Sequence, residues 1–242
     1  MVYDLIKNKL KSGKLFSVLI DPDKYDSPTL EKTIDLINPA GVDLIFVGGS
    51  LVSNGIDSQI ESIRNKTDIP VLLFPGSLLQ ISEKAHAILL LSLISGRNPE
   101  FLIGNQVVAA PVLKKSGIEI ISTGYILIHS GKLTSVEYMS NTRSIPYEKI
   151  DIAVATAMAG EMLGNKLIYM DAGSGAPKTI SGKMIRAVKN NISVPLVIGG
   201  GIRTKEKIIE VCESGADIIV VGNAIEKDKN LIKEFAKIIH KE

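Results

Sequence analysis

A segment around residue 170 brings a phenol, a carboxylate and a hydroxyl together within a few positions. The run Tyr169-Met170-Asp171-Ala172-Gly173-Ser174-Gly175 closes an apolar stretch and contains two flexible glycines. Alternation along an extended chain places Tyr169 and Asp171 on the same side, and we take them as candidate catalytic residues. A carboxylate here can accept a proton from a substrate hydroxyl, while Ser174 and the glycine backbone can donate to a phosphate group. The structural alternative for Asp171 is a cap of the following loop.

Two glycine-rich turns follow later apolar runs. They are Gly199-Gly200-Gly201-Ile202-Arg203 and Gly222-Asn223-Ala224. Glycines let backbone N–H groups approach an anion closely, and a pair of such turns is the usual phosphate site of a β/α barrel. The glycines of either turn alone could serve only to allow a tight turn of the backbone. The two turns together predict a bound phosphate group.

Oxygen ligands follow the first two apolar runs. Asp21-Pro22-Asp23-Lys24 supplies two carboxylates and an ammonium, and Gly48-Gly49-Ser50 supplies a hydroxyl. Hard oxygen ligands beside an otherwise open coordination sphere suit Mg²⁺, which takes few protein ligands and adds substrate phosphate oxygens. The alternative is a turn that begins at Asp21 or Asp23 and passes through Pro22. We favour Asp21 as the metal ligand because it directly ends the apolar run.

Short β-branched or leucine-rich runs carry these residues, and helix-length segments separate most of them. The runs are Phe16–Ile20, Leu44–Val47, Val71–Phe74, Ala87–Leu93, Ile118–Ile128, Leu167–Met170, Leu196–Ile198 and Ile218–Val221. Nearly continuous hydrophobicity is typical of parallel strands that are covered on both faces. We therefore predict a (β/α)8 TIM barrel that forms one domain over residues 1–242.

Two connections of this barrel are expected to be unusual. Only Ser77–Lys84 lies between the third and fourth runs, which is too short for a full packing helix, so the third helix should be degenerate or missing. The polar stretch Gly131–Pro146 lacks periodicity and is predicted to be a lid or a groove wall. After the fourth run, a helix could form one wall of an apolar groove, or its apolar residues could equally be ordinary core, which is the better interpretation for any single one of them. These residues are Phe101, Leu102, Ile103, Val107 and Val108.

Composition excludes several classes of protein. The chain has 242 residues, with 28 basic and 26 acidic side chains spread along it and a formal net charge of +2, so no nucleic-acid footprint is present. Lysines interrupt the first apolar residues, so no secretory signal is predicted. The apolar stretch Ala87–Ile94 is far shorter than the roughly 18 residues of a membrane span. We expect a cytoplasmic protein without a transmembrane segment.

Taken in order, these motifs resemble those of the geranylgeranylglyceryl phosphate synthase family, which includes heptaprenylglyceryl phosphate synthases. The resemblance spans nearly the whole chain and rests on residues 19–24, 47–50, 169–175, 197–203 and 220–224. It implies a barrel without a third helix. The long fifth-strand region and the aliphatic Leu19 resemble the second of the family's two groups, since the other group often carries Lys at that position. Asp171 stands where many relatives have Glu.

The resemblance also implies a ligand for each motif. Residues 169–175 with Gly200, Gly201, Gly222 and Asn223 would hold sn-glycerol 1-phosphate, and Asp21 and Ser50 would hold Mg²⁺. A prenyl diphosphate would lie across the barrel mouth, and Lys24 would supply a basic contact to it in place of the missing Lys. From its position at the end of the fourth run, Arg97 could also reach the diphosphate, or it could equally be a surface arginine. Family members of this kind often form homo-oligomers, and a lipid product implies a peripheral membrane contact.

The expected reaction is ether formation between the 3-hydroxyl of sn-glycerol 1-phosphate and geranylgeranyl diphosphate (C20), with release of diphosphate, as a step of ether-lipid biosynthesis. One alternative is the same reaction with a heptaprenyl (C35) donor. Another is a different phosphate-binding barrel enzyme, such as a phosphosugar isomerase or a thiamine phosphate synthase-like transferase. A phosphate-binding protein without catalytic activity is a third, and it would need neither the metal nor the carboxylate.

Overall fold

The computed structural model describes residues 1–52 and 55–241, and within them eight parallel strands close into a barrel. The strands are β1 (Leu15–Ile20), β2 (Leu44–Val47), β3 (Val71–Leu73), β4 (Ala87–Leu93), β5 (Glu119–Leu127), β6 (Leu167–Asp171), β7 (Leu196–Gly199) and β8 (Ile218–Val221). Each pairs with its neighbours in sequence, and β1 pairs with β8, where Ser17 lies opposite Val220. The predicted barrel is therefore confirmed.

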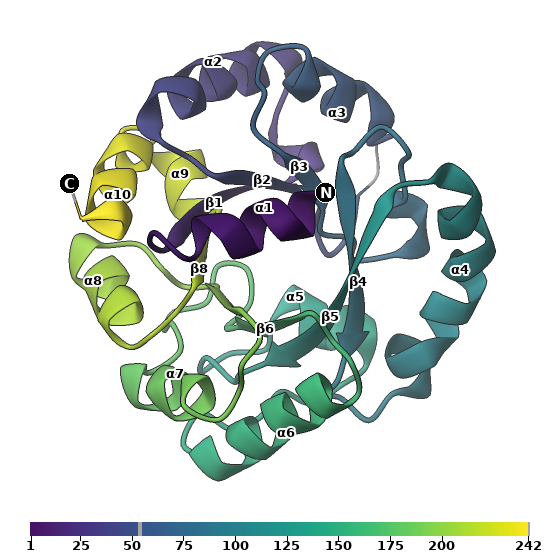
Figure 1. Cartoon of the computed structure of the whole chain (residues 1–242), viewed down its shortest axis with the longest axis vertical. Helices are drawn as coiled ribbons and strands as arrows, with labels where there is room; N and C mark the ends of the chain where they lie inside the picture. The colour runs from purple at the N-terminus through teal and green to yellow at the C-terminus, as the bar shows by residue number, and fades with distance from the viewer. Residues whose placement is uncertain (53–54, 242) are drawn as a thin grey trace.

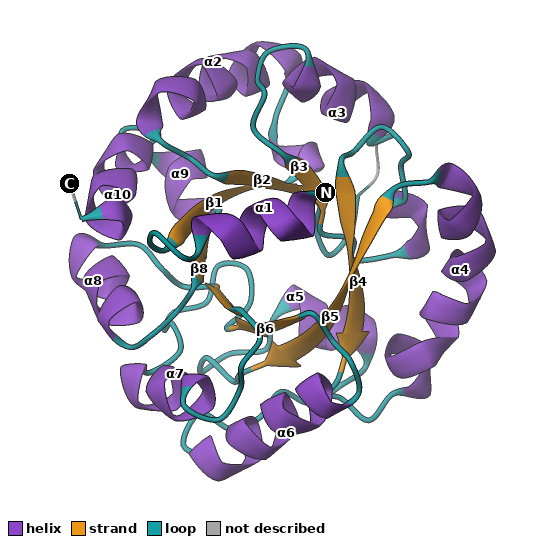
Figure 2. Ribbon diagram, in the orientation of Figure 1, coloured by secondary structure: helices purple, strands orange, loops and turns teal. Residues whose placement is uncertain are grey.

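Most helices surround the barrel, and α1 lies across one end of it, as Figures 1 and 2 show. The helices are α1 (Val2–Lys9), α2 (Ser27–Ile37), α3 (Asp57–Arg64), α4 (Asn105–Ser116), α5 (Ser135–Ser140), α6 (Ile150–Met162), α7 (Gly182–Lys189), α8 (Lys205–Glu213), α9 (Asn223–Lys227) and α10 (Leu231–His240). Four shorter turns are η1 (Pro22–Lys24), η2 (Asn38–Ala40), η3 (Leu78–Gln80) and the π-helical η4 (Glu100–Gly104). None of the helices in the described part of the chain is long and apolar enough to cross a membrane.

The strands divide the apolar core into two layers, because alternate side chains point to opposite faces. One layer fills the barrel and includes Phe46, Leu89 and Tyr169. The other packs between the strands and the outer helices. Helix α1 covers one end of the barrel (Figure 1) and contributes Ile6 to the inner layer, and the backbone N–H of Tyr3 donates to the Glu119 carboxylate over 3.1 Å. The carboxyl ends of the strands form the opposite, open end.

The structure confirms the prediction for the first of the two unusual connections and adds a helix to the second. Between β3 and β4 the chain forms only η3, so the predicted loss of the third helix is confirmed. The stretch from 131 to 146 is not wholly irregular, because it contains α5. The Thr134 side chain accepts a hydrogen bond from the Glu137 backbone, and the Glu137 carboxylate accepts one from the Thr134 backbone. This capping box nucleates a helix too short to show periodicity in the sequence.

Candidate functional site

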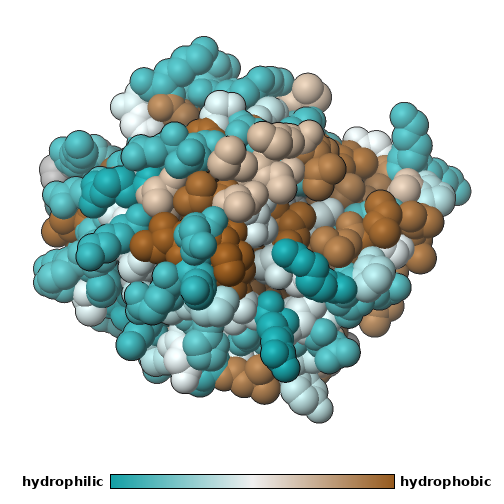
Figure 3. All heavy atoms as spheres, turned by 90° about the horizontal axis from the view of Figure 1, so that it is seen from below, coloured by the Kyte–Doolittle hydropathy of each residue, from teal (hydrophilic) through white to brown (hydrophobic). Residues whose placement is uncertain are grey.

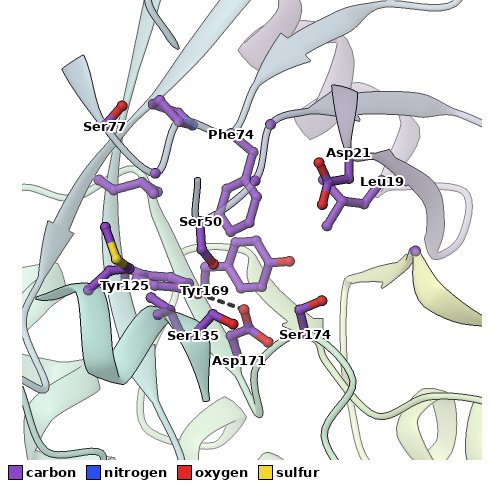
Figure 4. Close-up of a pocket in the computed structure, with 18 of the residues that line it drawn as sticks. Leu19, Asp21, Ser50, Phe74, Ser77, Tyr125, Ser135, Tyr169, Asp171 and Ser174 are labelled. Carbon is purple, nitrogen blue, oxygen red and sulfur yellow. Dashed lines mark hydrogen bonds between the residues drawn. The ribbon is translucent and has the colours of Figure 1, made fainter. Parts of the chain in front are cut away.

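One cavity of about 350 Å³ opens at the carboxyl ends of the strands and has two chemically different parts. Its polar part is lined by Asp21, Lys24, Ser50, Asp171, Ser174, Gly200, Gly201, Gly222, Asn223 and Glu226. Its apolar part is lined by Leu78, Ile81, Ile88, Leu90, Leu91, Leu93, Phe101, Ala109 and Leu113. Figure 4 shows part of the lining, with the rings of Phe74 and Tyr169 in its middle. The fold thus joins charged groups and an apolar groove in a single space.

Asp171 is the last residue of β6 and is buried, with 7% of its surface exposed. One carboxylate oxygen accepts a hydrogen bond from the backbone N–H of Gly173 over 2.7 Å. The other accepts one from the phenol of Tyr125 over 2.6 Å, the dashed line in Figure 4. Burial raises the pKa of Asp171 above its usual value, and both hydrogen bonds oppose that rise by favouring the charged form. A carboxylate whose pKa is raised towards neutral pH can take part in proton transfer there.

Tyr125 is a site residue that the sequence did not single out. It lies within β5, opposite Tyr169 in the register, and its hydroxyl reaches diagonally to Asp171 at the end of the next strand. Its ring packs edge-on against Tyr169 at 5.5 Å, and Phe74 stacks on Tyr169 at 5.0 Å between ring centroids. Burial raises the pKa of both tyrosines well above the usual value, so both phenols remain neutral hydrogen-bond donors.

The glycine turns let the backbone pass close to Asp171. Gly200 has φ +80°, and a Cβ at this position would lie 2.5 Å from the Oδ1 atom of Asp171. Gly201 has φ +71°, and its Cβ would meet the Lys178 carbonyl oxygen at 2.7 Å. Any larger residue at either position would be strained by its φ and would also collide with these atoms. The two glycines therefore allow the β7 turn to line the same cavity as the carboxylate.

Asn223 ties the turn after β8 to the loop after β6. Its side-chain oxygen accepts hydrogen bonds from the Ser174 hydroxyl and the Gly175 backbone, both over 2.9 Å, and its amide nitrogen donates to Glu226 over 3.1 Å. Arg203 donates to the Gly175 carbonyl over 3.0 Å. The two predicted phosphate-binding segments, far apart in sequence, are thus held together at the cavity.

Three residues of the predicted run from 169 to 175 do not line the cavity. Met170 points into the outer core, and Ala172 is also buried there. Gly173 acts through its backbone N–H on Asp171, and its φ of +91° with Thr134 close by explains the glycine. Side chains alternate along β6, so Tyr169 and Asp171 face the cavity and Met170 cannot.

Asp21, Lys24 and Glu226 form a charged group at the cavity edge. The Lys24 ammonium lies 3.3 Å from an Asp21 oxygen and 3.1 Å from a Glu226 oxygen. Burial alone would lower the pKa of Lys24, but the charges of Glu226 and Asp21 outweigh it and leave that pKa raised. The ammonium is therefore charged at neutral pH and can face an anionic substrate.

The donor set at Asp21 and Ser50 fits a magnesium ion that substrate oxygens complete. Both residues line the cavity, and a Cβ on Gly49 would lie 3.0 Å from an Asp21 oxygen, so glycine there leaves room for the carboxylate. Within the described residues no cluster of three or more His, Cys, Asp or Glu side chains could enclose a metal alone. One carboxylate and one hydroxyl match the small number of protein ligands that Mg²⁺ takes when it binds a phosphorylated substrate.

Arg97 lies elsewhere. Its guanidinium donates to the carbonyl oxygens of Ile94 over 3.0 Å and Gly96 over 2.8 Å, and it is not among the residues that line the cavity. The Arg97 side chain therefore stabilises the loop that follows β4, to whose carbonyl groups it is bonded. The predicted contact between Arg97 and a diphosphate therefore has no geometric support in this conformation.

The apolar groove uses a different face of α4 from the one predicted. Phe101 lines it, but Ile103, Val107 and Val108 are 60%, 62% and 61% exposed on the outside of the protein, and Leu102 does not line it either. Ala109 and Leu113 face the groove instead. The segment after Leu102 is helical, so its apolar residues point in several directions and those on one side of α4 turn away from the barrel. The apolar run in the sequence does not show which residues face the groove.

The groove exists because the third helix is missing. Ile88 and Leu90 lie on the outer face of β4, where a packing helix would normally cover them, and the neighbouring connection supplies only Leu78 and Ile81. Leu91 and Leu93 belong to the inner face of the same strand. The cavity therefore runs from the barrel mouth to the outer side of β4, under α4.

Comparisons with known proteins identify the family of this chain. A geranylgeranylglyceryl phosphate synthase of Chitinophaga pinensis is 55% identical over 97% of this chain and 94% of its own length, and one of Spirosoma linguale is 49% identical over 96% and 93%. The crystal structure of (S)-3-O-geranylgeranylglyceryl phosphate synthase from Thermoplasma acidophilum in complex with sn-glycerol-1-phosphate superimposes with a TM-score of 0.95 at 33% identity, covering 100% and 99% of the two chains. Residues 3–239 match the model of the PcrB family. The chain belongs to the PcrB family.

Proposed function

We propose that this protein is a Mg²⁺-dependent prenyltransferase that joins the 3-hydroxyl of sn-glycerol 1-phosphate to geranylgeranyl diphosphate and releases diphosphate. The observation that carries the proposal is the single cavity, which joins a polar pocket around Asp171 to an apolar groove under α4. Neither part alone would serve a reaction between a phosphorylated alcohol and a lipid donor. Relatives that bear the name of this synthase support it.

The glycerol phosphate would bind in the polar part. Ser174 and the backbone of Gly200, Gly201, Gly222 and Asn223 line this space and offer hydrogen-bond donors to phosphate oxygens. The neutral phenol of Tyr169 lines it too. The Thermoplasma acidophilum relative, which was crystallised with this substrate, supports the assignment.

Asp171 would act as the base. In the reaction the 3-hydroxyl oxygen forms a bond to C1 of the prenyl chain, the C1–O bond to diphosphate breaks, and the hydroxyl proton passes to the Asp171 carboxylate. The hydrogen bonds from Tyr125 and Gly173 hold that carboxylate in one orientation and favour its charged form. Tyr125 is thus a positioning residue for the base. General base catalysis of this kind contributes roughly 10²–10⁴-fold.

The leaving group would lie against Asp21, Ser50 and Lys24. When bound there, Mg²⁺ would neutralise charge on the diphosphate, which is worth several kcal/mol for such a group. The Lys24 ammonium lines the same cavity and would contact the diphosphate directly, once its partners Asp21 and Glu226 turn to the metal or the solvent.

The prenyl chain would occupy the groove between β4 and α4. Each methylene group that leaves water stabilises the complex by about 0.8 kcal/mol, so a chain of twenty carbons has ample binding energy. We favour the C20 donor, and a C35 donor in the same groove is the alternative.

A transfer assay tests the function. Labelled sn-glycerol 1-phosphate is incubated with Mg²⁺ and prenyl diphosphates of C10, C15, C20 and C35, and the lipid product is extracted into solvent. We expect a product with the 1-phosphate and none with sn-glycerol 3-phosphate, with C20 as the best donor. A preference for C35 would keep the chemistry and change the donor, whereas no transfer with any donor would favour a phosphosugar isomerase or another phosphate-binding barrel enzyme.

We also propose that the protein forms homo-oligomers through the outer faces of α4 and α6. Figure 3 views the side on which α6 lies and shows apolar side chains gathered over its middle and right. The exposed apolar residues of the two helices and their ends are Ile103, Val107, Val108, Val112, Ile152, Met162 and Leu163. An apolar face of this extent on a folded chain indicates contact with another protein surface. Sedimentation velocity of the wild type and of Val108→Glu tests this assignment.

A further inference from the structure

Five large apolar side chains project into solvent at the open end of the barrel, on three separate connections. They are Leu51 (68% exposed), Leu79 (88%), Leu133 (67%), Tyr138 (75%) and Met139 (50%). We call them the mouth surface. Leu51 follows β2, Leu79 lies in η3, and the other three belong to α5 and the residues before it. Leucine, methionine and tyrosine side chains with this exposure cost free energy in water unless something covers them.

The mouth surface is continuous with the groove. Leu51, Leu133, Tyr138 and Met139 line one shallow hollow together, which shows that the β2 connection and the α5 segment meet. Leu51 and Met139 also line the main cavity, as does Leu78 beside Leu79. An apolar path therefore leads from these exposed side chains into the space under α4.

The α5 segment presents its apolar side chains on a fixed support. The Glu137 carboxylate accepts hydrogen bonds from the Thr134 backbone and hydroxyl, both over 2.9 Å, and also from the Ser144 side chain. The Asn98 side chain donates to the Ser140 carbonyl over 2.7 Å. Because these groups hold α5 against the barrel, the exposure of its apolar residues is a property of the folded state.

The charges of this segment are basic where they are exposed. Between residues 131 and 144 the exposed charged side chains are Lys132 and Arg143, and the only acidic one, Glu137, is buried within the capping box. Apolar residues flanked by cations are typical of surfaces that rest on anionic lipid headgroups. The apolar face of α4 and α6, where we place self-association, is separate from these residues.

We propose that the mouth surface docks on an anionic phospholipid bilayer, so that a prenyl chain passes between the membrane and the groove without crossing water. This inference rests on the proposed function, because only a lipid substrate or product gives the apolar path a use. The side chains of the mouth surface would enter the headgroup region, and Lys132 and Arg143 would contact lipid phosphates. The barrel itself would remain outside the bilayer.

Vesicle flotation with the full chain tests this inference. The probes are vesicles of phosphatidylcholine alone and of phosphatidylcholine with phosphatidylglycerol. The double variant Leu133→Gln/Tyr138→Gln removes two exposed side chains that do not line the main cavity. The matched control Leu36→Gln/Ile209→Gln removes two exposed apolar side chains from α2 and α8.

We expect the wild type and the control to float with the anionic vesicles. The mouth variant should bind them about a hundredfold more weakly, since it lacks two apolar side chains and each one that enters the bilayer contributes roughly tenfold. Its turnover of a detergent-dispersed C10 donor should equal that of the wild type. Thermal unfolding and sedimentation velocity should show the same fold and the same assembly for all three proteins.

Four results would overturn the inference. If the wild type transfers prenyl groups without binding vesicles, the proposed function stands and the docking surface does not. Equal vesicle binding by the mouth variant would place the membrane contact elsewhere. Dissociation of an oligomer in the mouth variant, with no vesicle binding by the wild type, would make this surface an interface between copies. Absence of transfer with every donor would instead refute the proposed function, and this inference with it.

Discussion

Removal of one hydroxyl, in Tyr125→Phe, isolates the contact that positions the base. The phenol donates to Asp171 over 2.6 Å, and both side chains are buried, at 5% and 7% exposure. A hydrogen bond to a charged group contributes about 1.5–3 kcal/mol. The ring remains and fills the same space against Tyr169 and Phe74, so the change in packing is small.

The variant should alter both pH dependence and stability. Burial already raises the pKa of Asp171, and the Tyr125 hydrogen bond lowers it in part, so loss of the hydroxyl raises it further. The acid-side fall in kcat/KM, which follows protonation of the base, should therefore move to higher pH. The loss of about 1.5–3 kcal/mol in folding stability should be present above the pKa of Asp171 and should diminish as pH falls through it, because the neutral carboxyl needs the hydrogen bond less.

The assay is the pH profile of kcat/KM for prenyl transfer, with thermal unfolding measured over the same pH range. Tyr169→Phe is the matched control, because it removes a buried phenol from the adjacent strand, and no described hydrogen bond joins that phenol to Asp171. We expect the control to weaken glycerol phosphate binding without moving the acid limb. A Tyr125→Phe profile that is lower than that of the wild type but unchanged in shape would refute the positioning role.

Three further substitutions test other parts of the site. Asp171→Asn should lower kcat by roughly 10²–10⁴-fold while thermal unfolding shows no loss of stability, because burial disfavours the charged carboxylate; a marked loss of stability would contradict this. Asp21→Asn should lower kcat more than Asp171→Asn and raise the Mg²⁺ concentration for half-maximal activity, and the reverse order would contradict the assigned roles. Gly200→Ala should abolish glycerol phosphate binding, as measured by calorimetry. The control is Gly164→Ala, because Gly164 has a similar φ of +88° but no atom lies within 4 Å of its Cβ position. This control should lose only about 1–2 kcal/mol in stability. Equal binding by both glycine variants would argue against the cradle at Gly200.

The barrel could be predicted from local patterns because its strands are continuous apolar runs. Each predicted strand agrees with the structure within one residue at either end, and the short third connection was visible in the chain length between β3 and β4. Asp21, Ser50, Asp171 and the glycine turns were predicted to meet because the carboxyl ends of parallel strands share one end of a barrel. These inferences needed only position along the chain.

Other features depend on geometry that a linear pattern does not contain. The hydrogen bond between Tyr125 and Asp171 runs diagonally from β5 to β6, so it can be predicted only when the register of these two strands is known. Val107 and Val108 were assigned to the groove wall because every apolar residue of the segment counted equally, whereas the phase of α4 directs Ala109 inward. The capping box at Thr134 was present in the sequence as a signal for α5, but the helix was too short for periodicity to support it.

The central claim is that one cavity holds the anionic acceptor and the apolar chain of the donor, and the groove can be narrowed to test it. Ala109→Phe places a ring between α4 and β4, whereas Val108→Phe, one residue earlier, places the same ring on the outer face of α4, away from the groove. If the ring displaces about three methylene groups of the chain, the complex loses about 2–3 kcal/mol, or roughly fiftyfold in affinity.

The measurement is kcat/KM for C20 and C10 donors in both variants, with the affinity for sn-glycerol 1-phosphate as a check on the polar part. We predict that Ala109→Phe lowers kcat/KM for C20 far more than for C10, that glycerol phosphate binding is unchanged, and that Val108→Phe keeps the wild-type ratio of kcat/KM between the two donors. An equal loss for both donors, or no loss for either, would contradict the placement of the prenyl chain under α4.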